Sequence, residues 1–241
     1  MSVESQVALG RSALYELVSL AFLYPAPGTL ALLKDRACRV GEVASEMGPP
    51  ELMNVVMQLA DDLALVDEQT LEQEYVSVFG HSIASDCSLY EVEYANAEVF
   101  QKSGSLADLN GFYAAFGVKP NPELKDRLDH IGVELEFMQL LTIKEAYAHL
   151  NGHGSDKAAV CRQAQANFLA NHLAHWVKTL ARRLSQKTGG RGFYSSLGQL
   201  IDLQIDWEMN ILGLEMPPVS LASTTEPEEV DDECGTPPPH A

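Results

Sequence analysis

Hydrophobic residues recur along this chain at intervals of three and four positions, which is the spacing of one face of an α-helix. Ile131, Leu135 and Met138, for example, follow one another at i, i+4 and i+7 and therefore share a helix face. No stretch alternates polar and apolar residues between turn dipeptides, as the strands of a hairpin do. The pattern therefore predicts an all-α protein built as a helical bundle.

Residues that end a helix or begin the next one lie between the apolar stripes. Pro50 suits the first turn of one predicted helix, Asp67 suits the N-cap of the next, and Gly80 suits its end. In order, the stripes predict helices over about residues 14–24, 30–47, 50–63, 68–79, 96–116, 129–150, 155–188 and 197–212.

The longest of these helices is predicted to run without interruption from Ser155 to Thr188. Val160 belongs to its apolar face. Arg182 and Arg183 form a twin arginine near its end, and we expect both to face solvent.

The end of the chain differs in composition from the rest. Residues 217–241 combine many prolines with six acidic side chains, and such a segment cannot bury enough apolar surface to fold. We therefore predict a single-domain helical bundle over residues 1–216, followed by a disordered acidic C-terminal tail over residues 217–241.

The chain carries 34 Asp and Glu against 16 Lys and Arg, which gives a formal net charge of -18. Such a surface repels nucleic acid phosphates and anionic lipids but attracts a basic peptide. No apolar run approaches the ~20 residues of a membrane-spanning helix. The N-terminus also lacks the basic and apolar regions of a secretory signal. We therefore expect a cytoplasmic protein that binds no nucleic acid and has no integral membrane segment.

The doublet Asp129-His130, at the predicted start of a helix, is the strongest candidate for chemistry. Asp129 is a good N-cap residue, and His130 lies four positions before Glu134, so the two side chains can meet on a helix. Catalysis by such a pair needs a nucleophile. The chain has neither a G-x-S-x-G elbow nor a glycine-rich phosphate loop. The doublet therefore favours ligand recognition, and we predict that the protein is not an enzyme.

Four histidines leave a second interpretation open, in which the protein binds a metal or a cofactor. His172 and His175 are three residues apart, and His149 and His153 flank a predicted helix end. The sequence contains neither H-E-x-x-H nor the paired E-x-x-H motifs of di-iron bundles. We therefore predict no cofactor and keep the metal-binding helical protein as the alternative.

The loop over residues 81–94 combines small polar residues with two tyrosines and two glutamates. It is either a plain connector or the edge of a surface that accepts a basic, partly apolar peptide. The second role would suit its composition, because tyrosine rings stack and hydrogen-bond while carboxylates pair with arginine.

Five segments occur in an order that resembles a known family. They are Glu74-Tyr75-x-x-Val78-Phe79-Gly80, Cys87-Ser88-Leu89-Tyr90-Glu91-x-Glu93-Tyr94, Gly111-Phe112-Tyr113-x-x-Phe116-Gly117, Asp129-His130-Ile131-x-x-Glu134-Leu135-x-Phe137-Met138 and Phe168-Leu169-x-x-His172-Leu173-x-x-Trp176. Over roughly residues 10–212 the series is similar to the TorD/DmsD/NarJ family of redox-enzyme maturation chaperones.

The resemblance implies an all-helical cytoplasmic chaperone without enzymatic turnover. Its partner would be the catalytic subunit of a molybdenum oxidoreductase of the dimethyl sulfoxide reductase type. The chaperone would bind that subunit's N-terminal leader, often a twin-arginine signal, and assist cofactor insertion, assembly and export. A leader that is basic at one end and apolar beyond fits helix-in-groove docking on an acidic protein.

The resemblance also implies roles for particular side chains. Tyr75 and Phe79 would line the leader groove, Ser88 and Tyr90 would lie at its edge, and Asp129 and His130 would make polar contacts. On physical grounds, carboxylates at Asp129, Glu91 or Glu134 would pair with the arginines of the leader and set its orientation.

The chain departs from the family pattern at Leu128, where relatives often have proline, and over residues 81–86, where many are rich in proline and tryptophan. A third interpretation is a helical adaptor that binds a folded partner instead of a leader.

Overall fold

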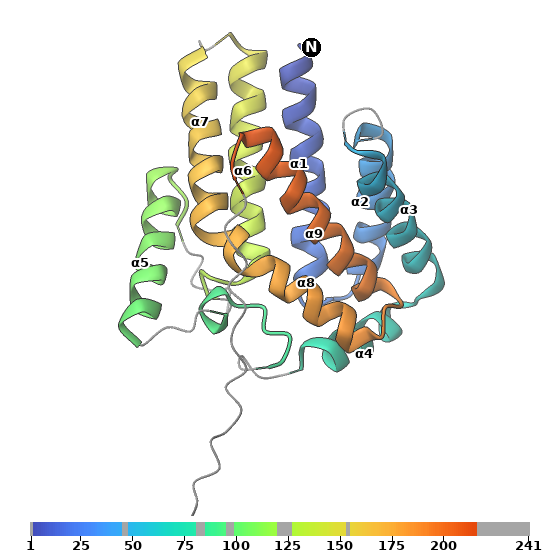
Figure 1. Ribbon diagram of the computed structural model, residues 1–241. Coiled ribbons are helices and arrows are strands. Elements are labelled where there is room, and N and C mark those ends of the chain that lie inside the picture. Colours follow the sequence, from blue (N-terminus) through green and yellow to red (C-terminus); the bar gives the residue numbers. More distant parts are fainter. Residues whose placement is uncertain are drawn as a thin grey trace, which may run out of the picture.

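The computed structural model describes residues 2–44, 48–80, 85–94, 99–119, 127–152 and 155–215. These residues form helices and loops without a strand (Figure 1), so the prediction of an all-α bundle is confirmed. The predicted tail, residues 217–241, lies outside the described residues. The helices are α1 (Val3–Phe22), α2 (Thr29–Ala44), α3 (Pro50–Leu65), α4 (Glu68–Phe79), α5 (Val99–Ala115), α6 (Ile131–Leu150), α7 (Ser155–Phe168), α8 (Ala174–Thr188) and α9 (Phe193–Leu212), with a 3-10 turn η1 (Glu91–Glu93) and a π-helical segment η2 (Leu169–Leu173).

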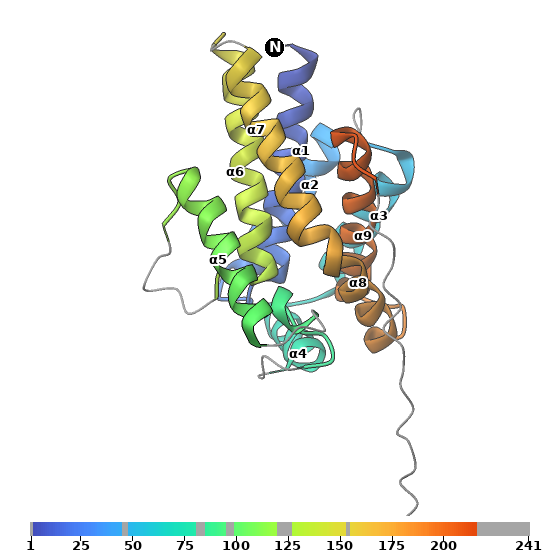
Figure 2. The same cartoon turned by 60° about the vertical axis from the view of Figure 1, so that its left-hand side comes forward.

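The bundle is centred on α1 and α6, which pack side by side, with α7 next to α6 (Figures 1 and 2). On the other side of α1, α2 packs against α1 and α3, and α3 packs against α9. The last two helices, α8 and α9, also pack on each other. In both views α5 stands at the outside of the bundle, next to α7 in Figure 1 and next to α6 in Figure 2.

The first turn of α6 lies very close to the end of α1. Ile131, Leu135 and Met138 have no exposed surface, which confirms the predicted buried face of this helix. Gly132 allows the close approach, because a Cβ atom there would lie 2.7 Å from Cδ2 of Leu23. The Ser19 hydroxyl donates a hydrogen bond of 2.8 Å to the Gly132 carbonyl. The end of α1 therefore packs directly against the residues that follow the Asp129-His130 doublet.

The predicted ends of α4 are confirmed. The Asp67 carboxylate accepts a hydrogen bond of 2.7 Å from the backbone N–H of Thr70, as an N-cap residue does. Gly80 ends the helix with a φ of 71°, a left-handed value that favours glycine.

The prediction of one uninterrupted helix over residues 155–188 is wrong in one respect. The π-helical segment η2 separates α7 from α8, and the two helices run in different directions in Figure 1. The wider turn places Leu169, His172 and Leu173 together in the interior. Val160, predicted to be buried, is 61% exposed, because the part of α7 that carries it packs through other residues.

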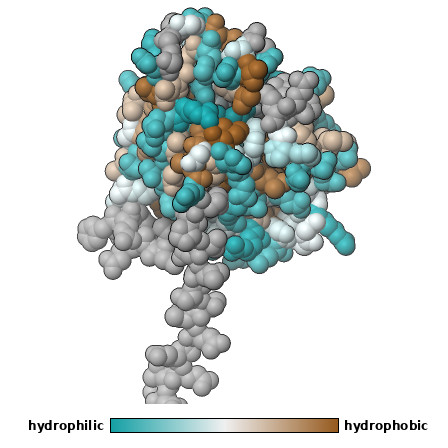
Figure 3. All heavy atoms as spheres, turned by 45° about the horizontal axis from the view of Figure 1, so that its top comes forward, coloured by the Kyte–Doolittle hydropathy of each residue, from teal (hydrophilic) through white to brown (hydrophobic). Residues whose placement is uncertain are grey.

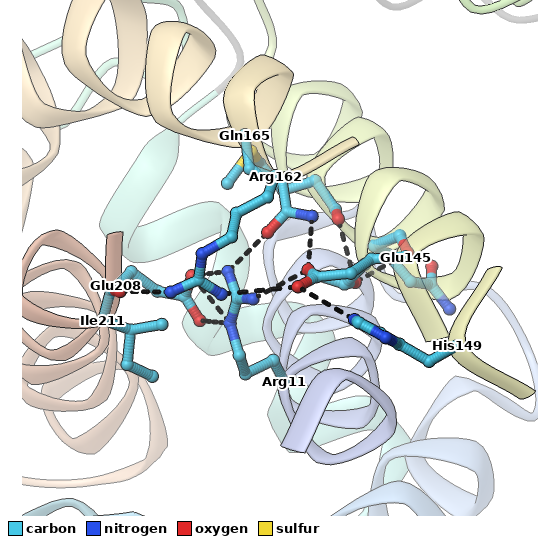
Figure 4. A network of polar contacts seen from close by, with 10 residues as sticks. Arg11, Glu145, His149, Arg162, Gln165, Glu208 and Ile211 are labelled. Carbon is cyan, nitrogen blue, oxygen red and sulfur yellow. Dashed lines mark hydrogen bonds and ion pairs between the residues drawn. The ribbon is translucent and has the colours of Figure 1, made fainter. Parts of the chain in front are cut away.

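A buried polar network, which the apolar stripes do not reveal, ties four helices together (Figure 4). Arg11 of α1, 1% exposed, donates through Nε to Glu208 Oε1 of α9 at 2.9 Å and through Nη2 to Gln165 Oε1 of α7 at 2.6 Å. Its Nη1 lies 3.2 Å from Glu145 Oε2 of α6, and Gln165 also donates to that oxygen at 2.8 Å. Arg162 adds a bond of 3.3 Å to the other oxygen of Glu145. Both carboxylates of this network, Glu145 and Glu208, are therefore paired.

The surface mixes polar and apolar side chains. On the face drawn in Figure 3, small brown apolar areas are bordered by teal polar residues. Within the described ranges, no helix combines the length and the apolar character that crossing a membrane requires.

Candidate functional site

The loop over residues 85–94 is joined to the start of α6 by an antiparallel bridge between Tyr90 and His130. The backbone N–H of Ile131 donates to the Leu89 carbonyl at 2.8 Å, and that of Glu91 donates to the Asp129 carbonyl at 3.0 Å. Two of the five motif segments, far apart in the sequence, therefore form one structural unit.

The N-cap of α6 is His130, so the assignment of this role to Asp129 is wrong. Nδ1 of His130 accepts a hydrogen bond of 3.0 Å from the backbone N–H of Gly132. Asp129 lies one residue too early and faces the other way. Its carboxylate accepts from the backbone N–H of Val92 at 3.3 Å and from the guanidinium of Arg127, with Nε and Nη2 at 3.0 and 2.8 Å. Asp129 therefore anchors the loop, while His130 starts the helix.

Four side chains on the bridge form what we call the bridge surface: Tyr90, Glu93, Arg127 and His130. The rings of Tyr90 and His130 meet edge to face, with centroids 5.2 Å apart. The Arg127 guanidinium carbon lies 4.9 Å from the centre of the Tyr90 ring, and its Nη1 is 3.8 Å from Glu93. His130 is almost fully buried, whereas the Arg127 side chain is 34% exposed. The bridge surface thus offers an aromatic ring between charged groups of both signs.

Ser88 lies beneath this surface and holds the loop in shape. It is buried, and its hydroxyl accepts a hydrogen bond of 3.3 Å from the backbone N–H of Tyr90. The Tyr94 hydroxyl donates to the Ser88 carbonyl at 2.7 Å. Tyr94 in turn packs on Trp176 of α8, with ring centroids 5.0 Å apart. The predicted edge of the binding surface therefore rests on the core.

Behind the bridge lies a buried carboxyl group, Glu134, which has no exposed surface. Neither of its carboxylate oxygens makes a hydrogen bond of regular geometry to a described residue, although Trp176 and Glu91 lie close enough to affect its pKa. Burial raises the pKa of Glu134 well above its usual value, and the negative charges of Glu91 and Asp129 act in the same direction. Burial also raises the pKa of Asp129, although Arg127 opposes that effect. Burial and the neighbouring negative charges therefore both favour the protonated form of Glu134.

Glu91 connects the loop to α5 and η2. The Ser105 hydroxyl donates to its Oε1 at 2.9 Å, and Nδ1 of His172 lies 3.1 Å from its Oε2. The other ring nitrogen of His172 lies 3.3 Å from a carboxylate oxygen of Asp108. The loop is thus fastened on its inner side as well.

We predict that Glu134→Gln removes a pH-dependent loss of stability. A carboxyl whose pKa is raised on folding stabilises the protein fully below the unfolded value of about 4.3. That contribution is lost as the pH rises through the higher folded value. The free energy of unfolding of the variant, minus that of the wild type, should therefore increase from pH 5 to pH 9 in urea titrations. Glu136→Gln, an exposed carboxyl on the same helix, is the control. A difference independent of pH would contradict the prediction.

Tyr75 and Phe79 lie apart from the bridge surface, in an aromatic cluster at the other side of the α1 end. Both are nearly buried, and their ring centroids are 4.8 Å apart. Phe79 packs on Phe22, and Tyr75 packs edge-on against Tyr24 at 5.3 Å.

This cluster backs an open groove. Tyr24, which is 52% exposed, lines a groove of about 420 Å³ together with Leu30, Glu68 and Glu72. The groove lies between the α1–α2 connection and α4. The groove is linked to the start of α6, because Leu23, the residue before Tyr24, lies against Gly132. The structure therefore places the eight predicted site residues in two groups: Ser88, Tyr90, Glu91, Asp129, His130 and Glu134 at the bridge, and Tyr75 and Phe79 behind the groove.

Residues outside the predicted set also hold the site together. Arg183 was expected to face solvent, but its guanidinium carbon lies 4.7 Å from the centre of the Tyr94 ring and its Nη1 donates to the Asp86 carbonyl at 3.1 Å. His172 and Trp176 support the loop from η2 and α8. The spacing of Phe168, His172 and Trp176 at i, i+4 and i+8 signalled a shared face. No local pattern marks Arg127, and the twin arginine that contains Arg183 did not indicate its contact with Tyr94.

The histidines of the alternative interpretation are not gathered at one site. His149 lies 4.0 Å from Glu145 in the Arg11 network, whereas His172 binds Glu91, and His175 is exposed. His153 lies outside the described residues. Within the part of the chain that the structure covers, no three His, Cys, Asp or Glu residues are grouped so that they could hold a metal ion.

Known proteins resemble this chain over much of its length. The selenate reductase assembly chaperone protein of Thauera selenatis is 33% identical over 144 residues, which cover 58% of this chain and 71% of that protein. The chlorate reductase assembly chaperone protein of Ideonella dechloratans is 32% identical over 136 residues, 56% and 68% of the two chains. The perchlorate reductase assembly chaperone protein of Dechloromonas aromatica is 26% identical over 200 residues, 81% and 85% of the two chains.

The family model described as nitrate reductase delta subunit matches residues 48–182, the span that contains α4, the loop, α6 and most of α8. The selenate, chlorate and perchlorate reductase relatives are named as assembly chaperones, not as catalysts. The chain therefore belongs to the nitrate reductase delta subunit family, the TorD/NarJ-type redox-enzyme maturation chaperones that its motif series resembles.

Proposed function

We propose that this protein is a cytoplasmic assembly chaperone for the catalytic subunit of a molybdenum oxidoreductase of the dimethyl sulfoxide reductase type. It binds the N-terminal leader of that subunit and assists cofactor insertion, assembly and export. Its relatives are named as assembly chaperones of selenate, chlorate and perchlorate reductases, and these names support an oxidoreductase as the client. The observation that carries the binding site is the bridge between Tyr90 and His130, which joins two motif segments into one surface.

The chemistry of the bridge surface suits the basic end of a twin-arginine leader. Tyr90 offers a ring face on which a guanidinium can stack, and Glu93 adds a partly exposed carboxylate. The formal net charge of -18 attracts a basic segment over a longer range. This attraction speeds encounter and should weaken as salt is added.

The groove beside α4 suits the apolar part of the leader. Its floor contains Leu30 and Leu71, and its rim carries Glu68 and Glu72. Tyr75 and Phe79 support the groove wall through Tyr24 and are therefore proposed to shape it from behind. An amphipathic helix that buries its apolar side here would keep its basic end near the bridge surface.

The proposed function predicts that Tyr90→Ala weakens binding of a synthetic leader peptide. Aromatic side chains at the centre of an interface often contribute about 2 kcal/mol, so the dissociation constant should rise roughly 30-fold. Isothermal titration calorimetry with the full chain measures this change. Tyr147→Ala is the matched control, because Tyr147 is an exposed tyrosine near the far end of α6.

Capture of the client tests the same proposal in cells. Tagged protein should retain the catalytic subunit, and deletion of that subunit's leader should reduce the amount retained. A leader peptide that does not bind the wild-type chain, together with capture that is indifferent to leader deletion, would refute the proposal. That pair of results would favour an adaptor that binds a folded partner.

A further inference from the structure

Arg127, one of the four residues of the bridge surface, has contacts to Asp129, Tyr90 and Glu93. Its Nε and Nη2 donate to the two carboxylate oxygens of Asp129, at 3.0 and 2.8 Å. Its guanidinium carbon lies 4.9 Å from the centre of the Tyr90 ring. Its third nitrogen, Nη1, lies 3.8 Å from a carboxylate oxygen of Glu93. One guanidinium is thus held by two carboxylates and an aromatic ring.

This arrangement is selective for arginine. A carboxylate that receives two parallel N–H groups matches the planar fork of a guanidinium, and the ring adds a cation–π contact. A lysine ammonium is a compact point charge and cannot satisfy both carboxylate oxygens in the same way. The three groups Asp129, Tyr90 and Glu93 therefore form a binding site for a guanidinium, which we call the guanidinium site.

The carboxylate of this site is held in place independently of Arg127. The backbone N–H of Val92 donates to Asp129 Oδ2, and the Asp129 carbonyl accepts from the backbone of Glu91. Asp129 has no exposed surface, whereas the side chain of Arg127 remains 34% exposed. Arg127 therefore lies on the solvent side of the carboxylate and covers it.

Arg127 can also leave without unfolding the protein. It pairs with a residue only two positions away, and its partly exposed side chain can extend into water. Only the arginine of this pair is exposed, so its departure alone would leave the buried Asp129 carboxylate without a guanidinium, which is costly unless another guanidinium replaces it. A second guanidinium, delivered by a bound peptide, would make the same contacts at little net cost.

We propose that Arg127 is an internal substitute for an arginine of the client and that a leader arginine displaces it from the guanidinium site. This inference rests on the proposed function, because it names the group on the leader that the bridge surface recognises. In the free chaperone Arg127 covers the buried Asp129 carboxylate. On binding, the leader arginine takes over the contacts to Asp129, Tyr90 and Glu93, and Arg127 moves into solvent.

Competition of this kind lowers the apparent affinity for the leader, because only the fraction of molecules with an open site binds. Arg127→Gln opens the site, so the leader peptide should bind about three- to tenfold more tightly. Arg127→Lys keeps the charge but loses the fork, and its affinity should lie between those of the wild type and Arg127→Gln. Both variants should bind more tightly than the wild type only to a peptide that contains arginine.

The experiment is calorimetry with two synthetic peptides, a twin-arginine leader and the same peptide with both arginines replaced by lysine. Arg36→Gln is the control for charge, because Arg36 is also a partly exposed arginine in ion pairs, but on α2. It should leave the affinity within about twofold of the wild type. Circular dichroism before each titration confirms that the variants are folded.

Three results would overturn the inference. Arg127→Gln could leave the affinity for the arginine peptide unchanged, it could weaken that affinity, or it could strengthen binding of the lysine peptide equally. Each of them leaves the proposed function standing, provided that the wild-type chain binds the leader. Failure of the wild type to bind either peptide refutes the proposed function instead.

Discussion

Replacing Arg11 with methionine is expected to destabilise the protein by about 3–5 kcal/mol, the usual cost of leaving a buried charge without its partner. The Arg11 side chain is 1% exposed and is bound to Glu208, Gln165 and Glu145 at once. Methionine would fill much of the space but leave the Glu208 carboxylate unpaired in the interior. Urea unfolding followed by circular dichroism measures the free energy of unfolding.

Two further variants separate this explanation from a general loss of charge. Arg39→Met removes an arginine that is 44% exposed and lies 3.7 and 3.5 Å from Glu16 and Asp35. It should cost no more than about 1 kcal/mol. Adding Glu208→Leu to Arg11→Met should restore part of the lost stability, because the unpaired carboxylate is then gone. Equal losses for Arg11→Met and Arg39→Met would contradict the role of the buried network.

Truncating Phe168 to alanine is the second change with a large expected effect, a loss of about 3–5 kcal/mol. Phe168 ends α7 and has no exposed surface. Its ring centroid lies 4.8 Å from that of Phe137 on α6, 5.3 Å from that of Phe112 on α5 and 5.0 Å from that of His172 in η2. The alanine variant leaves a cavity where these elements meet, and urea unfolding should show the loss.

A graded pair of variants tests whether packing is the cause. Phe168→Leu keeps most of the volume and should cost about 1.5 kcal/mol or less. Phe116→Ala removes a half-buried ring at the edge of the same cluster, 5.9 Å from Phe137, and should cost less than Phe168→Ala. If Phe168→Ala and Phe168→Leu were equally stable, the proposed packing would be wrong.

Most helices could be predicted from the sequence, because each buries one apolar stripe and ends at residues with local effects. The Asp67 cap and the Gly80 end of α4 act within a few residues of themselves, so their roles are visible in the sequence. The π-helical segment η2 between α7 and α8 could not be predicted in this way. Its residues Leu169–Leu173 continue the apolar pattern, and the wider turn depends on packing.

Only part of the candidate site could be predicted, because the rest depends on packing between distant segments. The motif segments containing Tyr90 and His130 were each visible, but the backbone bridge between them depends on how α6 packs against α1. Asp129 was a plausible N-cap by residue type alone. In the folded chain its carboxylate is drawn to Arg127 and to the loop, and His130 takes over the cap.

The sequence by itself determined the helical class, the buried face of α6, the acidic charge and the family motifs, since these follow from residue types and short-range spacing. The tertiary structure alone decided which distant groups meet. It paired Arg11 with Glu145 and Glu208, buried Glu134 beside Glu91 and Trp176, and set Arg127 over Tyr90 and Asp129. Such contacts depend on the directions of side chains brought together by packing, and no local pattern encodes them.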